Sequence, residues 1–253
     1  KNNEFIYTIL FLKDLPLKDA DDRSIFFQHL NQILNIFSIQ TQEYTILPIL
    51  ISSLSYTKSL KEAPLILEVI FSIGSNPKIS EDSYENTIIP SIIPLFESKD
   101  RNIRIHLLKN IDNLINHFTP KLINETIFPN VIIGMNDTIS SMKSATIVSM
   151  VSLAPKLNKE NNKTLIRELK RLQNNDQDPS IRYNSVICMT KIAEFIDEEY
   201  RLSTLLSVFT AASKDSFHST RKAGITGFIV CKKYFSSKSD IISNNVLVTL
   251  SPL

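Results

Sequence analysis

Apolar and basic positions recur along the chain with a period of 39 residues. Basic residues stand at Arg104, Lys143, Arg182 and Arg221. Apolar columns follow four, seven and ten positions later: Leu108, Ile147, Val186 and Ile225; Ile111, Met150, Met189 and Phe228; Leu114, Leu153, Ile192 and Cys231. These offsets place three apolar side chains on one helical face, so each copy contains an amphipathic helix.

Each copy also contains an earlier helix and a polar break. The earlier helix supplies the apolar column Ile88, Ile127, Ile166 and Leu205. The break supplies the column Ser98, Asp137, Asp176 and Asp215, and these residue types favour helix N-caps. A helix–turn–helix unit cannot cover its own apolar face, so its copies must stack. The period lies near the roughly 40–47 residues of HEAT and armadillo repeats, so we predict an all-α HEAT-type helical-repeat solenoid of about six helix pairs.

The N-terminal third is less regular. Leu47-Pro48, Ile89-Pro90 and Phe128-Pro129 occupy equivalent places, which we assign to positions near the start of a first helix. The expected helices there are residues 22–38, 42–56 and 62–73, and residues 241–253 should begin an unfinished repeat. We expect residues 1–253 to form a single HEAT-repeat domain of a longer protein, because the chain starts at Lys1 without methionine and stops abruptly at Leu253.

Composition narrows the fold and the function class. Four glycines are roughly a quarter of what average usage predicts, which argues against parallel α/β folds and β-sandwiches. Within the last repeat, Gly224 and Gly227 indicate close helix packing. Cys188 and Cys231 fit buried thiols in a reducing compartment. Neither a membrane-spanning apolar run nor a nucleophile, acid–base pair or metal cluster stands out, so we predict no enzyme, cofactor or metal site.

The aspartate and basic columns have two interpretations. They could form a binding ladder, or they could tie successive repeats together at the turns between helices. We favour the structural role, because such a row fixes the angle between repeats. This inter-repeat ladder comprises Asp137, Lys143, Asp176, Arg182, Asp215 and Arg221.

Charge divides unevenly along the chain. Residues 1–100 hold 8 Lys/Arg and 13 Asp/Glu, a net of −5, and residues 101–253 hold 20 and 13, a net of +7. A positive stripe on a solenoid could follow a phosphate backbone or an acidic protein, whereas the alternative is a solvated helix surface. The candidate binding surface comprises Lys156, Lys159, Lys163, Arg167, Lys170, Arg171 and Lys222.

Several stretches resemble the Scy-like, or N-terminal kinase-like, pseudokinases. They are residues 149–158 (SMVSLAPKLN), 178–192 (DPSIRYNSVICMTKI) and 214–228 (KDSFHSTRKAGITGF), together with Ile88-Ile89-Pro90 and Ile127-Phe128-Pro129. In that family a kinase-like domain without normal catalytic power precedes a HEAT-repeat domain. The chain matches the HEAT part only, since it contains none of the Gly-rich, Val-Ala-Ile-Lys, His-Arg-Asp or Asp-Phe-Gly motifs.

The resemblance implies a cytoplasmic scaffold, peripheral at Golgi membranes, that is linked to coat-protein-I (COPI) traffic between Golgi and endoplasmic reticulum. The expected partners are proteins such as COPI components or small GTPases, and self-association is a further expectation. Some relatives act as cytoplasmic adaptors in nuclear tRNA export, so tRNA binding is the alternative. The position of four cations separates the two alternatives. If Lys163, Arg167, Lys170 and Lys222 face one groove, tRNA binding is favoured; if they scatter over the convex surface, it is disfavoured.

Overall fold

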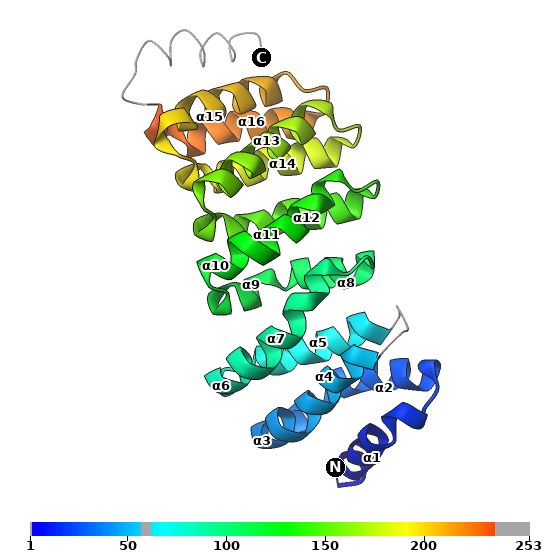
Figure 1. Cartoon of the computed structure of the whole chain (residues 1–253). Coiled ribbons are helices and arrows are strands. Elements are labelled where there is room, and N and C mark those ends of the chain that lie inside the picture. Colours follow the sequence, from blue (N-terminus) through cyan, green and yellow to red (C-terminus); the bar gives the residue numbers. More distant parts are fainter. Residues whose placement is uncertain (1, 57–61, 236–253) are drawn as a thin grey trace. The chain divides into compact units, whose positions relative to one another are not determined.

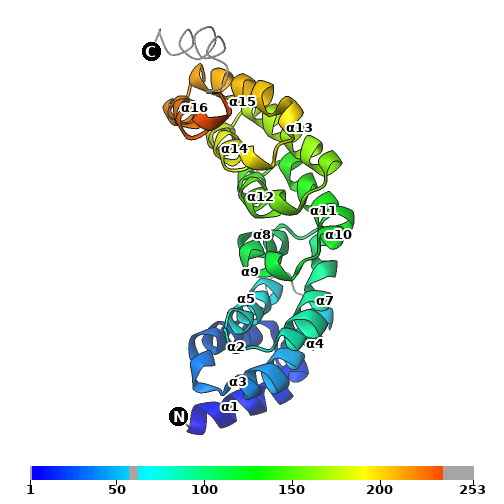
Figure 2. The same ribbon diagram turned by 90° about the vertical axis from the view of Figure 1, so that its left-hand side faces the viewer.

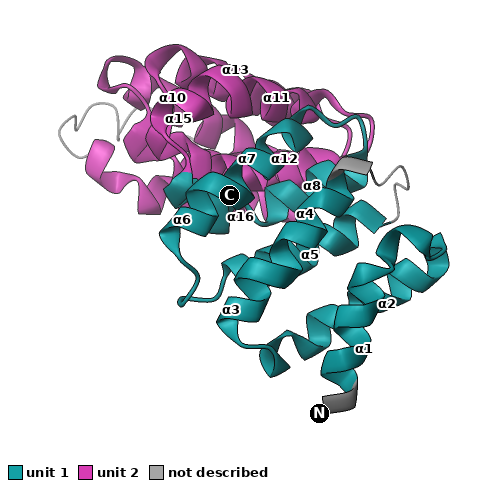
Figure 3. Ribbon diagram, turned by 60° about the horizontal axis from the view of Figure 1, so that its bottom comes forward, with its two compact units in different colours: residues 1–117 teal, residues 118–253 magenta. Residues whose placement is uncertain are grey.

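The computed structural model describes residues 2–56 and 62–235, and all regular secondary structure in those ranges is helical. Two compact units divide the chain, residues 1–117 and residues 118–253 (Figure 3). In each unit, helices pair and the pairs stack (Figure 1), which confirms the predicted all-α helical-repeat solenoid. The expected helix at residues 241–253 lies outside the described residues.

Unit 1 is built from short helices interrupted by tighter and wider turns. Its α-helices are α1 Asn2–Lys13, α2 Ala20–Ile33, α3 Ile39–Thr41, α4 Leu47–Tyr56, α5 Glu62–Gly74, α6 Glu81–Ser83, α7 Ile89–Ile92, α8 Arg101–Lys109 and α9 Ile111–Leu114. The 3-10 segments are Leu15–Leu17, Leu34–Ile36, Ile93–Glu97 and Ile115–His117, and the π segments are Gln42–Ile46 and Tyr84–Ile88.

Unit 2 is more regular. Its α-helices are α10 Pro120–Leu122, α11 Phe128–Ile132, α12 Ser140–Leu153, α13 Lys159–Asn175, α14 Pro179–Lys191, α15 Glu198–Ser213 and α16 His218–Val230. A π segment spans Ile123–Ile127, and the 3-10 segments are Ile133–Asn136, Ala154–Lys156, Ala193–Phe195 and Lys232–Tyr234.

The apolar columns form the core. Every column residue is buried except Ile225, which is half-buried. Burial therefore explains the 39-residue period, because each repeat must present the same face to its neighbours. Cys188 and Cys231 are both buried and unpaired.

Pro48, Pro90 and Pro129 are the second residues of α4, α7 and α11, near a helix start as predicted, but each of these segments continues a helix that begins earlier in the chain. Ser38, Ser80 and Thr119 cap these helices at the N-terminus, each ten residues before its proline. Between cap and proline, each helix widens into a five-residue π turn. Proline lacks an N–H group, and its ring clashes with the carbonyl four residues earlier in a regular α-helix. The wider turn relieves this conflict.

Unit 1 contains two buried carboxylates that the sequence did not single out. Glu62 on α5 accepts hydrogen bonds from Nε and Nη2 of Arg23 on α2, both at 2.9 Å. Glu43 accepts hydrogen bonds from the hydroxyls of Ser80 and Ser83, and the Ser80 bond is the main cause that lowers the pKa of Glu43. Both carboxylates join residues of different helices, so they stabilise the stacking within unit 1.

In unit 2 each column aspartate first organises its own turn. Asp137, Asp176 and Asp215 accept a hydrogen bond from the backbone N–H two residues later, at 2.9, 3.0 and 2.8 Å. Ser98 does the same in unit 1 with its hydroxyl, at 3.1 Å. This local requirement explains why the column holds only aspartate and serine, whose short side chains reach that N–H group.

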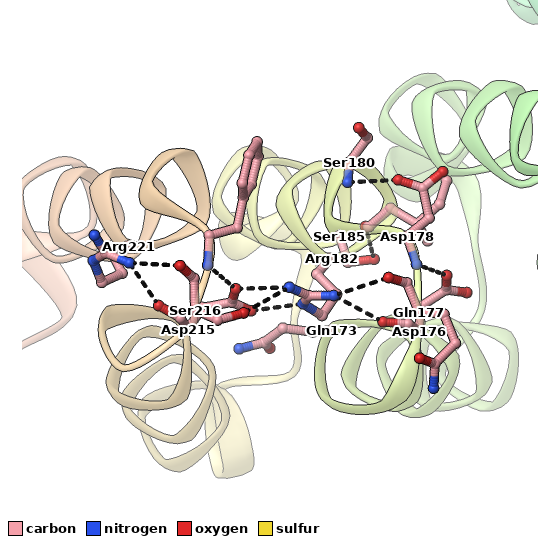
Figure 4. A network of polar contacts seen from close by, with 12 residues as sticks. Gln173, Asp176, Gln177, Asp178, Ser180, Arg182, Ser185, Asp215, Ser216 and Arg221 are labelled. Atoms are coloured by element: carbon pink, nitrogen blue, oxygen red, sulfur yellow. Dashed lines mark hydrogen bonds and ion pairs between the residues drawn. The ribbon is translucent and has the colours of Figure 1, made fainter.

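Two basic column residues of unit 2, Lys143 and Arg182, connect one turn to the next, and Figure 4 shows the contacts of Arg182. Lys143 Nζ lies 2.6 Å from Asp176 Oδ2, and Arg182 donates from Nε and Nη2 to the two carboxylate oxygens of Asp215 at 2.8 and 2.9 Å. Lys143 and Arg182 thus each pair with the aspartate of the following repeat. Towards its own turn, Arg182 Nη1 donates to the Asp176 carbonyl at 3.0 Å, and Arg221 Nη1 donates to the Asp215 carbonyl at 3.0 Å.

Two glycines let α15 and α16 approach closely, which confirms the close packing predicted for them. A Cβ atom on Gly224 would lie 2.8 Å from Ala212 Cβ and 2.9 Å from the Ser213 backbone nitrogen. A Cβ atom on Gly227 would meet the ring of Phe209. Backbone atoms cannot rotate away, so Gly224 is the less replaceable of the two.

Gly224→Ala should destabilise unit 2 by about 1–3 kcal/mol, because α16 must shift away from α15. Urea unfolding followed by circular dichroism measures this loss. Val230→Ala on the same helix is the control, since Val230 is 59% exposed and its truncation should change stability little. Wild-type stability of Gly224→Ala would contradict the close packing.

Stability should depend on the Arg182–Asp215 pair in a pH-dependent way. The hydrogen bond from Arg182 lowers the pKa of Asp215 below its ordinary value of 3.8. A lowered pKa contributes stability above the unfolded-state pKa and loses it as pH falls through the folded-state pKa. Asp215→Asn should therefore cost about 2–4 kcal/mol at pH 7, and the cost should shrink only below about pH 4.

Urea unfolding of the wild type, Asp215→Asn and the exposed control Glu194→Gln at pH 7, 5, 4 and 3 tests this expectation. The control should show a small difference from wild type at each pH. An Asp215→Asn cost that is the same at pH 3 as at pH 7 would rule out an ion-pair contribution.

Candidate functional site

The helices of unit 2 form two rows. Helices α12, α14 and α16 pack closely on one another, whereas α13 and α15 contact each other much less (Figure 2). The closely packed row therefore lies on the inside of the curve of unit 2. We call α12, α14 and α16 the inner row, and α11, α13 and α15 the outer row.

Three cations of the predicted surface meet in one depression on the outer row. Lys163, Arg167 and Lys170 stand three or four residues apart on α13 and therefore on one side of that helix. With Tyr200 and Thr204 of α15 they line a depression of about 460 Å³. The sequence spacing predicts this part of the site because α13 is a regular helix of 17 residues capped by Asn158.

Neighbouring acids neutralise these cations only weakly. Lys163 lies 3.6 Å from Glu160, and Arg167 lies 3.5 Å from Glu168. The Lys163 and Arg167 side chains are 55% and 72% exposed, and exposed pairs of this kind contribute about 0–1 kcal/mol. Both cations can therefore reach an external anion.

Other members of the predicted surface hold repeats together. Lys156 donates to the Phe118 carbonyl at 2.8 Å, and Arg171 donates to Asn136 Oδ1 at 2.7 Å. Lys159 lies 3.0 Å from Asp197, whose hydrogen bond raises the pKa of the lysine, but the lysine side chain is 80% exposed, so this pair stabilises the stack little. Three of the seven candidates are thus engaged in contacts between segments that lie far apart in the sequence.

Lys222 lies on the other row. It lines a depression of about 550 Å³ between α14 and α16, together with Tyr183, Ile187, Phe217 and Thr226. The seven candidate residues therefore do not form one surface. Sequence reasoning missed Tyr183, although the 39-residue register places it level with Ser144 and Lys222, one position after the basic column.

The described part of the chain shows neither a metal site nor a reactive cysteine. No group of three or more His, Cys, Asp or Glu is placed there to hold a metal ion. Burial raises the pKa of the Cys188 thiol to about 12, so this thiol remains protonated at neutral pH and is a poor nucleophile. None of the helices in the described ranges is long and apolar enough to cross a membrane.

Curated relatives cover most of the chain, although no family model matches it. The chain is 34% identical over 227 residues to the probable inactive serine/threonine-protein kinase scy1 of Dictyostelium discoideum, which covers 90% of this chain and 27% of that protein. It is 28% identical over 231 residues to the protein kinase domain-containing protein ppk3 of Schizosaccharomyces pombe, which covers 90% of this chain and 35% of that protein.

A mouse relative, the protein-associating with the carboxyl-terminal domain of ezrin, is 26% identical over 164 residues, covering 62% of this chain and 22% of that protein. Among solved structures, the crystal structure of Cex1p superposes with a TM-score of 0.76 at 23% identity, covering 99% of this chain and 49% of that one. At this identity the likeness concerns the fold.

The chain spans between about a fifth and about a third of the length of these curated relatives. The matched region runs through the repeats of both units, and one relative bears the name of an inactive kinase. The chain belongs to the Scy-like pseudokinase family, of which it represents a HEAT-type helical-repeat portion.

Proposed function

We propose that this chain is a non-catalytic, protein-binding scaffold domain that acts in COPI-linked vesicle traffic between Golgi and endoplasmic reticulum. Its proposed location is cytoplasmic and peripheral at Golgi membranes. The observation that carries the proposal is the family membership together with the stacked helices. A stack of repeats offers a long surface for a protein partner at little folding cost per repeat.

The relatives support protein binding. The nearest of the reported relatives in identity is named as a probable inactive kinase, and another is named for its association with the carboxyl-terminal domain of ezrin. COPI coat components and small GTPases are the partner classes we propose for this chain.

A tRNA-binding adaptor in nuclear export is the second candidate. The observation in its favour is the outer-row depression, where Lys163, Arg167 and Lys170 converge. Phosphates could be held there without base stacking. Against it, Lys222 lies on the inner row, so the four cations do not share one groove. This division favours the protein scaffold.

Fluorescence anisotropy of tRNA at several salt concentrations, together with a pull-down of purified COPI coat, separates the candidates. For a protein scaffold we expect coat retention and tRNA affinity no tighter than nonspecific, roughly 10⁻⁴–10⁻⁶ M at physiological salt. Simultaneous charge reversal of Lys163, Arg167 and Lys170 to glutamate should weaken tRNA binding no more than reversal of the exposed Lys191, Lys222 and Lys232.

Sub-micromolar tRNA binding with a steep salt dependence, lost only on reversal of the outer-row cations, would replace the scaffold by the tRNA adaptor. Absence of coat retention by the full-length protein would reject the COPI link.

A further inference from the structure

The inner row of unit 2 carries no acidic residue. None of the helices α12, α14 and α16 contains aspartate or glutamate, whereas the outer helices α13 and α15 contain Glu160, Glu168, Glu198 and Glu199. The carboxylates beside the inner row stand at the helix ends: Asp176 and Asp215 accept charged donors, and Asp178, the N-cap of α14, accepts the backbone N–H group of Ser180. An approaching anion therefore meets no like charge on the helices of this row.

Nine side chains of the inner row share three equivalent positions per helix. The 39-residue register aligns them, each set spaced by four residues along one helical stripe. All nine are half-buried or exposed. We call this set the inner stripe: Ser144, Val148, Ser152, Tyr183, Ile187, Lys191, Lys222, Thr226 and Val230.

The inner stripe combines apolar surface with two cations. Val148 is 61% exposed and Val230 is 59% exposed. Tyr183, Ile187, Phe217 and Lys222 all line the 550 Å³ depression. Exposed apolar side chains grouped beside a hollow mark an interaction surface more often than a solvated face.

The ladder decides which cations remain accessible. Lys143 and Arg182 point into the turns and are paired there, and Arg221 donates to backbone carbonyls. Lys191 and Lys222 are exposed. They are the inner-stripe cations that a ligand can approach.

The two cations define a spacing. Lys222 lies level with Tyr183 in the repeat register, and Lys191 follows Tyr183 by eight residues on α14. At 1.5 Å per helical residue, the two levels are about 12 Å apart along the groove. Because the neighbouring helices α14 and α16 also lie about 8–10 Å apart sideways, the two lysines are separated by about 15 Å, which an extended peptide covers in about five residues at roughly 3.3 Å each.

We infer that the inner stripe is the docking surface for a short acidic peptide segment of a partner protein. The segment carries an apolar anchor for the depression between α14 and α16 and acidic residues on either side, which pair with Lys222 and Lys191. Charge complementarity selects this occupant, because the stripe offers cations and apolar surface without any carboxylate. The inference rests on the proposed protein-binding function and names its face and its partner chemistry.

A labelled peptide of sequence Ser-Asp-Glu-Leu-Phe-Glu-Asp-Ser tests the surface by fluorescence anisotropy with the full chain. We expect binding that weakens roughly tenfold or more in Lys222→Glu and in Tyr183→Ser. The matched control Lys163→Glu makes the same charge change on the outer row and should leave binding within about twofold of wild type. Peptides with Asn-Gln for the acids, or Ser-Ser for Leu-Phe, should bind at least tenfold more weakly.

No binding of the acidic peptide, or equal weakening by Lys222→Glu and Lys163→Glu, would overturn the inference. The same variants in a COPI pull-down distinguish this failure from that of the proposed function. Coat retention unchanged in Lys222→Glu and Tyr183→Ser, with no peptide binding, leaves the scaffold and rejects the inner stripe. If the wild-type protein does not retain the coat, the COPI proposal is rejected, whether or not the protein binds the peptide.

Discussion

The stacking of unit 2 depends on carboxylates that two repeats share. Asp176 and Asp215 each accept a backbone N–H group of their own turn and, at the same time, the charged side chain of the preceding repeat. The Asp215 and Arg182 side chains are only 10% and 13% exposed, so solvent screens this pair little. A charged donor that also holds the neighbouring turn fixes the angle between repeats as well as adding stability.

In this arrangement, some cations of unit 2 hold repeats together, whereas others are exposed to solvent. The cations of the repeated column are engaged at the turns, and others, such as Lys156 and Arg171, hold distant segments together. Among the exposed cations, two groups stand beside a depression: the outer-row cluster on α13 and the inner stripe. The excess positive charge read from the sequence is thus not one stripe, and each group suits a different kind of partner.

The sequence predicted the helices whose buried positions recur in every repeat. The apolar columns follow from a requirement that is the same in each copy, so periodicity alone reveals them. It did not predict the forward pairing of Arg182 with Asp215, because an aspartate six residues before the arginine satisfies the same column pattern as one 33 residues after it. The π turns were missed since Leu47-Pro48 is also a common opening of a helix. Lys156 and Arg171 are separated from the accessible cations because they donate to carbonyl groups of neighbouring repeats. The spacing of residues along one helix does not reveal such contacts.

A double-mutant cycle on Arg182 and Asp215 tests the shared-carboxylate account most directly. Urea unfolding of wild type, Arg182→Gln, Asp215→Asn and the double variant gives the coupling energy of the pair at pH 7. The account predicts a coupling of about 1–3 kcal/mol, because both partners are nearly buried and bidentate. A coupling below about 0.5 kcal/mol, within the range of additive sites, would contradict it.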